Sequence, residues 1–170
     1  MPNDFLQLCV RREFLTNYQV ERLLGGDKNG FFFGDYKVQY YIGSGDTARV
    51  YRATHRRTQQ VVAIKVLRKR FSRRESQYSR FLRDGELGRS LEHSNIVPVY
   101  EVCSLKKIHF LATEFVEGYN LLEFVKFRKR IDPVEATKFM TDIASGLAYA
   151  SEQGHQHRDL KLTNVLISSL

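Results

Sequence analysis

Residues 1–30 have the apolar spacing of short helices. Apolar side chains recur at helical intervals over residues 4–13. Thr16 is followed three residues later by Gln19, a pattern that predicts a capping box at the start of a second helix, and a pair of glycines then ends that helix. This pattern predicts a helical prefix that docks on another part of the chain and carries no chemistry of its own.

From residue 31 the hydrophobic pattern changes to short β-rich runs. Five runs have this character and are separated by turns or by one helical stretch at residues 75–91: residues 36–42, 48–54, 61–67, 97–103 and 108–113. Tight turns join the first three, which predicts an antiparallel meander. The sequence therefore predicts a three-stranded meander, then one long helix, then two further strands joined by a turn.

The last part of the chain returns to helical spacing. Residues 121–130 and residues 133–153 predict two helices, and Asp132-Pro133 marks the start of the second. Gly154 ends it. A polar stretch and a short apolar run, Val165-Leu166-Ile167, then predict a loop followed by a strand.

Composition narrows the class of protein but not its partner. The chain has 170 residues with 42% hydrophobic content, enough for one domain with a real core. Its formal charge of +8 favours phosphates, nucleotides, acidic proteins or nucleic acid as partners. Two distant cysteines predict reduced thiols, and no apolar run reaches the roughly 18 residues that cross a bilayer. We expect a soluble, cytoplasmic chain without a membrane segment.

Two features of the first three predicted strands indicate an anionic ligand. The turn between the first two strands reads Gly43-Ser44-Gly45-Asp46-Thr47-Ala48, and its glycines allow backbone N–H groups to approach phosphate oxygens. A plain hairpin turn explains the same residues. Lys65, in Val62-Ala63-Ile64-Lys65 on the third strand, needs an anionic partner if it is buried.

The polar stretch near the end carries the strongest chemical signal. His157-Arg158-Asp159-Leu160-Lys161-Leu162-Thr163-Asn164 spaces an acid, a cation and an amide as phosphoryl transfer requires. A polar surface loop before a strand is the alternative interpretation.

Taken in order along the chain, these motifs resemble those of the protein kinase family. The glycine turn, V-A-I-K, the His93-Ser94-Asn95-Ile96-Val97 segment, a hinge at residues 114–121 and H-R-D-L-K-x-x-N all follow the family's order. Lys161 stands two residues after the aspartate, a position where serine/threonine kinases also have a lysine. The chain as a whole resembles the eukaryotic-like serine/threonine kinases of bacteria. The resemblance implies an α+β fold. Residues 31–113 would form a kinase N-lobe with a five-stranded antiparallel sheet and one long helix, and residues 114–170 would form a hinge and an incomplete C-lobe.

The resemblance also implies ATP and Mg²⁺ as cofactors, a protein substrate and a role for each site residue. Asp159 would orient and deprotonate the attacking hydroxyl, Lys161 would steady the moving phosphoryl group, and Asn164 would hold Mg²⁺. Lys65 would contact the ATP phosphates. The remaining residues would surround the nucleotide: Gly43, Ser44 and Gly45 at the phosphates, Ile42, Val50 and Ala63 at the purine, Thr113 as gatekeeper, Glu114 and Val116 at the adenine edge, and Asn120 near the ribose.

Three departures from the family pattern qualify this expectation. Ala48 replaces the third glycine and Asp46 adds a negative charge. Asp84 stands where the family has the glutamate that pairs with the lysine, and it has about 1.5 Å less reach. No D-F-G follows the catalytic loop, so we expect a truncated kinase domain with little or no transfer activity. The alternative is a nucleotide-binding or scaffolding, pseudokinase-like module.

Two further features admit other partners. The basic run at residues 68–74 predicts a solvated connection between strand and helix, with a nucleic-acid-binding module as the weaker alternative. The apolar face of residues 133–153 packs on later helices in the family. We therefore expect that the N-terminal helices cover it, that a partner protein covers it, or that the chain is an interrupted gene product.

Overall fold

A computed structural model of the chain describes residues 2–169. It divides into two compact units. The sheet unit comprises the residues up to Glu86 together with Val99–Phe115, and the helical unit comprises Leu87–Pro98 together with the residues from Val116 onward. Within the part of the chain that is described, no helix is both long enough and apolar enough to cross a bilayer.

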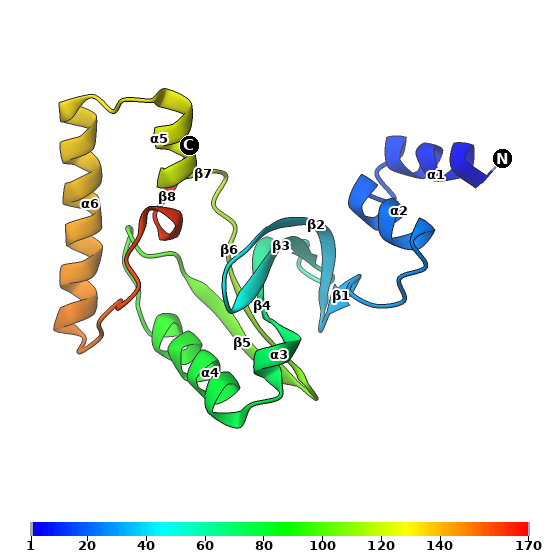
Figure 1. Cartoon of the computed structure of the whole chain (residues 1–170), viewed down its shortest axis with the longest axis horizontal. Coiled ribbons are helices and arrows are strands. Elements are labelled where there is room, and N and C mark those ends of the chain that lie inside the picture. The colour runs from blue at the N-terminus through cyan, green and yellow to red at the C-terminus, as the bar shows by residue number, and fades with distance from the viewer. Residues whose placement is uncertain (1, 170) are drawn as a thin grey trace. The chain divides into compact units, whose positions relative to one another are not determined.

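The sheet unit is built on an antiparallel sheet with the strand order β1-β2-β3-β4-β6-β5 (Figure 1). The strands are β1 (Phe32–Phe33), β2 (Tyr36–Ser44), β3 (Ala48–His55), β4 (Val61–Leu67), β5 (Val99–Leu105) and β6 (Ile108–Glu114). All five strands expected from the sequence are confirmed. The additional strand, β1, is only two residues long, too short to show an alternating pattern.

The two faces of the sheet differ in character because side chains alternate along each strand. On one face Val62, Ile64 and Phe110 are almost fully buried and form a cluster with Tyr36, Ala53 and Ala112. Ala63 and Lys65, the intervening residues of β4, belong to the opposite face. The register sets Lys65 between Val50 of β3 and Leu111 of β6.

Two helices follow β4 in the sheet unit. A short helix, α3 (Lys69–Ser72), lies inside the basic run, where the sequence indicated only a connection, and α4 (Glu75–Arg89) is the predicted long helix. Gly85 is the buried residue of α4, and a Cβ added there would lie 2.4 Å from Leu111 Cδ2. The helix thus approaches the sheet closely beside the cross-strand neighbour of Lys65.

The N-terminal prefix has two helices, α1 (Pro2–Arg11) and α2 (Asn17–Leu24), and α2 docks on β2 through the predicted capping box. Gln19 N donates to Thr16 Oγ1 at 3.2 Å, and Thr16 N donates to Gln19 Oε1 at 3.0 Å. The same two side chains also donate to β2, Thr16 to the Gln39 carbonyl and Gln19 to the Val38 carbonyl. Gln19 is only 2% exposed. The prefix therefore covers two carbonyls where β2 carries a bulge.

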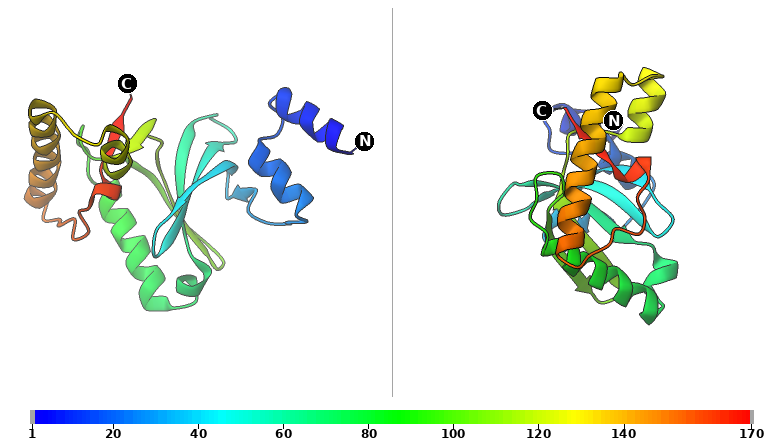
Figure 2. Two further views of the ribbon diagram at one scale, coloured as in Figure 1. Left: turned by 45° about the horizontal axis from the view of Figure 1, so that its top comes forward. Right: turned by 90° about the vertical axis from the view of Figure 1, so that its left-hand side faces the viewer.

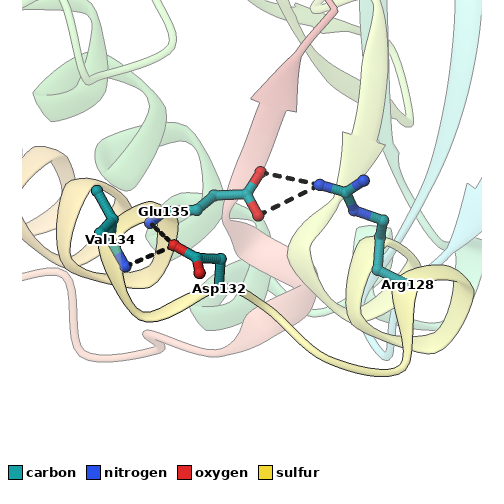
Figure 3. A network of polar contacts seen from close by, with 4 residues as sticks. All are labelled: Arg128, Asp132, Val134 and Glu135. Carbon is teal, nitrogen blue, oxygen red and sulfur yellow. Dashed lines mark hydrogen bonds and ion pairs between the residues drawn. The ribbon is translucent and has the colours of Figure 1, made fainter.

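The helical unit contains the elements that hold residues 157–164, which we call the H-R-D loop. They are β7 (Gly118–Asn120), α5 (Leu121–Arg128), α6 (Pro133–Glu152), the 3₁₀ turn η1 (Leu162–Asn164) and β8 (Leu166–Ser168). Two further views show α6 as one continuous helix (Figure 2). Its N-terminus is capped by Asp132, whose Oδ1 accepts from Val134 N and Glu135 N, and Glu135 pairs with Arg128 at 3.4 Å (Figure 3).

Packing on α6 leaves part of its surface apolar and exposed. Phe139 meets Phe124 of α5 edge to face at 5.7 Å, and Tyr149 packs on His93. Gly146 lies against Asn95, and a Cβ added at this glycine would lie 3.1 Å from the Asn95 carbonyl oxygen. Val134 is 79% exposed and Met140 is 65% exposed.

Candidate catalytic and nucleotide-binding site

The H-R-D loop brings together the three residues that the sequence proposed for transfer chemistry. Lys161 Nζ lies 3.0 Å from Asp159 Oδ2. Asn164 Nδ2 donates to the Asp159 carbonyl at 2.7 Å and to Asp159 Oδ2 at 3.1 Å. A cation and an amide therefore converge on one carboxylate, which itself stays accessible, with 67% of its side chain exposed.

This arrangement keeps Asp159 ionised. The hydrogen bond from Lys161, then that from Asn164, lower the pKa of the Asp159 carboxyl below its ordinary value of 3.8. An ionised carboxylate can orient a hydroxyl group and accept its proton. The local geometry thus suits the role that the sequence assigned to this residue.

Replacing Lys161 by methionine is expected to raise the pKa of Asp159 towards 3.8, because the largest cause of the depression is removed. A depressed pKa means that the charge persists to lower pH, so the titration midpoint of the variant should lie at higher pH than that of the wild type. Carboxyl ¹³C chemical shifts, followed against pH without magnesium, give this midpoint. Lys138→Met, an exposed change on α6, should leave it unmoved. An unchanged Asp159 midpoint in the Lys161 variant would contradict the expectation.

Backbone pairing anchors the loop to the segment that precedes α5. β8 pairs antiparallel with β7, with Gly118 opposite Ser168 and Asn120 opposite Leu166. Leu121 N donates to the Val165 carbonyl, and Ser169 N donates to the Glu117 carbonyl, both at 2.8 Å. The strand after the loop is therefore held at both ends.

Gly118 makes this pairing possible. Its φ is 151°, and a Cβ added there would lie 1.9 Å from the Ile167 carbonyl oxygen. No side chain fits in that space without separating the two strands. Gly118 was not among the residues predicted from the sequence, although an isolated glycine within a strand often marks such a close approach.

The residues present fit a magnesium ion. Asn164 uses its amide nitrogen towards Asp159, which leaves its Oδ1 oxygen at the other end of the amide for a cation. Magnesium prefers hard oxygen ligands and takes few of them from the protein, the rest coming from phosphates and water. In residues 2–169 no group of three His, Cys, Asp or Glu side chains forms a metal-binding cluster. Asn164 would therefore act together with ligands of the nucleotide.

In the sheet unit, the register places the expected nucleotide residues on one face. Val50 pairs with both Gly43 and Lys65, and Ala63 pairs with Thr113. Ile42 lies at an irregularity of β2 and is 47% exposed. The paired residues lie on the sheet face opposite the Phe110 cluster: Gly43, Val50, Ala63, Lys65 and Thr113.

The glycine turn is open where a phosphate would approach. Gly45 N donates to the Ala48 carbonyl at 2.9 Å and closes the turn. A Cβ added at Gly43 would meet no atom within 4 Å, and one at Gly45 would lie 3.9 Å from the Ala48 carbonyl. The turn, with Ser44 at the end of β2, thus presents accessible backbone, a fit for phosphate oxygens.

Other residues singled out in the sequence have different local partners. Asp84 pairs with Arg80 at 3.7 Å on the exposed side of α4, and its neighbour Gly85 is the residue that packs against the sheet. Asn120 caps α5, with its Oδ1 accepting from Glu123 N at 2.9 Å. This capping role was missed, although the Asn-x-x-Glu spacing is visible in the sequence.

Glu114 and Val116 lie at the division between the two units. Glu114 is the last residue of β6, and Val116 is the first residue of the following segment in the helical unit. Both precede β7 on the connection that the sequence described as a hinge.

Comparison with known proteins gives consistent matches. The family model described as protein kinase domain matches residues 36–170. Serine/threonine-protein kinase PrkC of Bacillus subtilis (strain 168) is 34% identical over 137 residues, which are 81% of this chain and 21% of PrkC. Probable serine/threonine-protein kinase PknB of Lactococcus lactis is 34% identical over 142 residues, 82% of this chain and 23% of PknB.

A solved structure agrees with these sequence matches. The crystal structure of the Mycobacterium tuberculosis PknI kinase domain is similar with a TM-score of 0.71 and 27% identity, covering 81% of this chain and 56% of that one. The likeness confirms the kinase-like fold expected from the sequence. The chain spans about a fifth of the length of the curated relatives it matches.

Proposed function

Because the chain belongs to the protein kinase family, we propose that it binds ATP with magnesium and carries the transfer residues of a serine/threonine protein kinase. The observation that carries this proposal is the Asp159 carboxylate held by Lys161 and Asn164. The same residue types at this spacing serve phosphoryl transfer in kinases. We propose the same kinase activity, with a protein substrate, for any longer protein that contains these residues.

Each residue contributes a defined step. Asp159 accepts the hydrogen bond of the substrate hydroxyl and takes its proton at the carboxylate. Lys161, 3.0 Å from that carboxylate, offsets negative charge on the transferred group. Lys65 and the backbone of the glycine turn hold the phosphates, and Val50 and Ala63 cover the purine. When bound, magnesium neutralises charge on the phosphates.

The 170 residues hold only part of the family's metal-binding set. They include Asn164, but they contain no D-F-G sequence and therefore lack its aspartate. We infer that the 170-residue polypeptide by itself binds nucleotide and transfers phosphate slowly or not at all. The alternative within the same family is a nucleotide-binding or scaffolding module.

The expected macromolecular contact is a protein substrate, or a partner on the exposed side of α6. The expected compartment is the cytoplasm.

A thermal-shift titration with ATP, with and without Mg²⁺, tests nucleotide binding. Ligand at ten times its Kd should stabilise the protein by about 1.4 kcal/mol. Lys65→Met should reduce the shift, because the phosphates lose a cation, and Lys107→Met, in the exposed turn between β5 and β6, should not. The absence of any shift with wild-type protein would exclude ATP binding.

Transfer itself needs a separate measurement. Radiolabelled phosphate from ATP is followed into a general protein substrate, with Asp159→Asn as the matched variant. Incorporation that requires Asp159 supports the enzyme, whereas ATP stabilisation without incorporation supports the non-transferring module.

A further inference from the structure

The basic run after β4 is attached to the glycine turn by its arginines. Arg68 N donates to the Thr47 carbonyl at 2.9 Å. Arg68 Nη2 donates to the Gly45 carbonyl at 2.8 Å and also to Ser44 Oγ. Arg70 Nη2 donates to the Asp46 carbonyl at 2.8 Å. These contacts involve residues for which the sequence indicated only a solvated connection or a nucleic-acid surface.

The fold explains why these contacts form. The register of β3 and β4 ends at Ala48 opposite Leu67, which sets Arg68 directly beside the turn. Helix α3 then turns the chain, and Arg70 reaches back to the tip of the turn. The Arg70 guanidinium also lies 4.7 Å from the centre of the Phe71 ring, which restricts its side chain.

Holding the carbonyls determines where the amides point. The carbonyls of Gly45, Asp46 and Thr47 are successive, and all three accept from the basic run. A planar trans peptide directs the N–H of the next residue opposite to the carbonyl. The N–H groups of Asp46 and Thr47 are therefore directed away from the arginines, as a row of donors available to an anion.

We propose that Arg68 and Arg70 are positioning residues that hold the glycine turn with its amides ready for the ATP phosphates. The proposal rests on the ATP binding proposed above. It accounts for two departures of this turn from the family pattern. The arginines restrain a turn in which Ala48 stands at the third glycine position, and their charges offset that of Asp46.

Binding measurements on Arg68→Gln, Arg70→Gln and the double variant test the proposal. Calorimetry is done in parallel with ATP and with adenosine, which lacks phosphates. Each single change should weaken ATP binding by about 10-fold, the equivalent of one charge-assisted hydrogen bond, while adenosine binding stays within about 2-fold. Arg73→Gln is the matched control, since among the described residues its side chain has no bond to the turn. Equal losses for both ligands, or no loss, would overturn the proposal.

A second measurement separates the ordering of the glycine turn from the electrostatic attraction between the arginines and ATP. Backbone ¹⁵N order parameters of residues 45–47, measured without nucleotide, should be near 0.85 in the wild type and fall towards 0.6 in the double variant. Arg68→Lys retains the charge, but its side chain is one bond shorter and lacks the planar guanidinium, so it should lower both the order parameters and ATP affinity. Full ATP affinity in Arg68→Lys would show that charge alone acts and would overturn the positioning role.

The same readout distinguishes this proposal from the proposed function. If wild-type protein binds no ATP, the proposed function fails. Loss of order in the variants would then still support the hold of Arg68 and Arg70 on the turn, and unchanged order would overturn that as well.

Discussion

Replacing Gly118 by alanine is expected to destabilise the helical unit by about 2–4 kcal/mol, from backbone strain and steric overlap together. The added Cβ would lie 1.9 Å from the Ile167 carbonyl oxygen, a backbone atom that cannot move without breaking the pairing of β7 and β8. A φ of 151° also disfavours any residue with a side chain. The strand that follows the Asp159 loop loses its anchor, so amides of β7 and β8 should exchange faster with solvent.

Gly154→Ala provides the matched control in the same unit. Gly154 also has a positive φ, of 78°, but a Cβ there would meet no atom within 4 Å. It should therefore show only the cost of the conformation, about 1 kcal/mol. Urea unfolding followed by circular dichroism, together with amide exchange, compares the two variants. Equal effects for both glycines would show that the close approach at Ile167 does not constrain the fold.

Replacing Phe110 by alanine is expected to destabilise the sheet unit by about 3–5 kcal/mol, the usual loss for a buried aromatic side chain. Phe110 is fully buried and meets Tyr36 edge to face at 6.0 Å and Phe33 at 6.2 Å. Its ring also lies over Gly34. Phe33 and Tyr36 belong to strands that are fixed in the sheet, so they cannot move far enough to fill the cavity.

Phe14→Ala removes the same side chain from an exposed position. Phe14 is 69% exposed, so its loss should change the free energy of unfolding by less than about 0.5 kcal/mol. Urea unfolding of both variants, at equal protein concentration, gives the two differences. A small effect at Phe110 would mean that the cluster around it is not the main core of the sheet unit.

The contacts of α4 give the departure at Asp84 a structural explanation. The helix approaches the sheet through Gly85, which packs on Leu111 and Val102. Asp84 is then placed on the outer side of α4, where it pairs with Arg80 and 61% of its side chain is exposed. The sequence identified an unusual residue at this position, but only the packing of the helix shows which residue contacts the sheet.

Much of the site was visible in the sequence because its signals are local. The capping box of Thr16 and Gln19, the five strands, and the acid, cation and amide of the H-R-D loop all depend on spacings of a few residues. In the loop, spacing is enough to bring Lys161 and Asn164 to Asp159, since a single 3₁₀ turn connects them. Such short-range patterns can be recognised without knowing the tertiary contacts of the chain.

Tertiary structure decided which distant partner each local element meets. The capping residues also donate to β2, Gly118 lies against Ile167, and Arg68 and Arg70 hold the glycine turn, all over long separations in sequence. Strand register and helix packing choose these partners, and neither follows from short-range spacing. The sequence thus determined which residue types meet in the Asp159 loop and which elements flank it, while the fold determined the contacts that hold those elements in place.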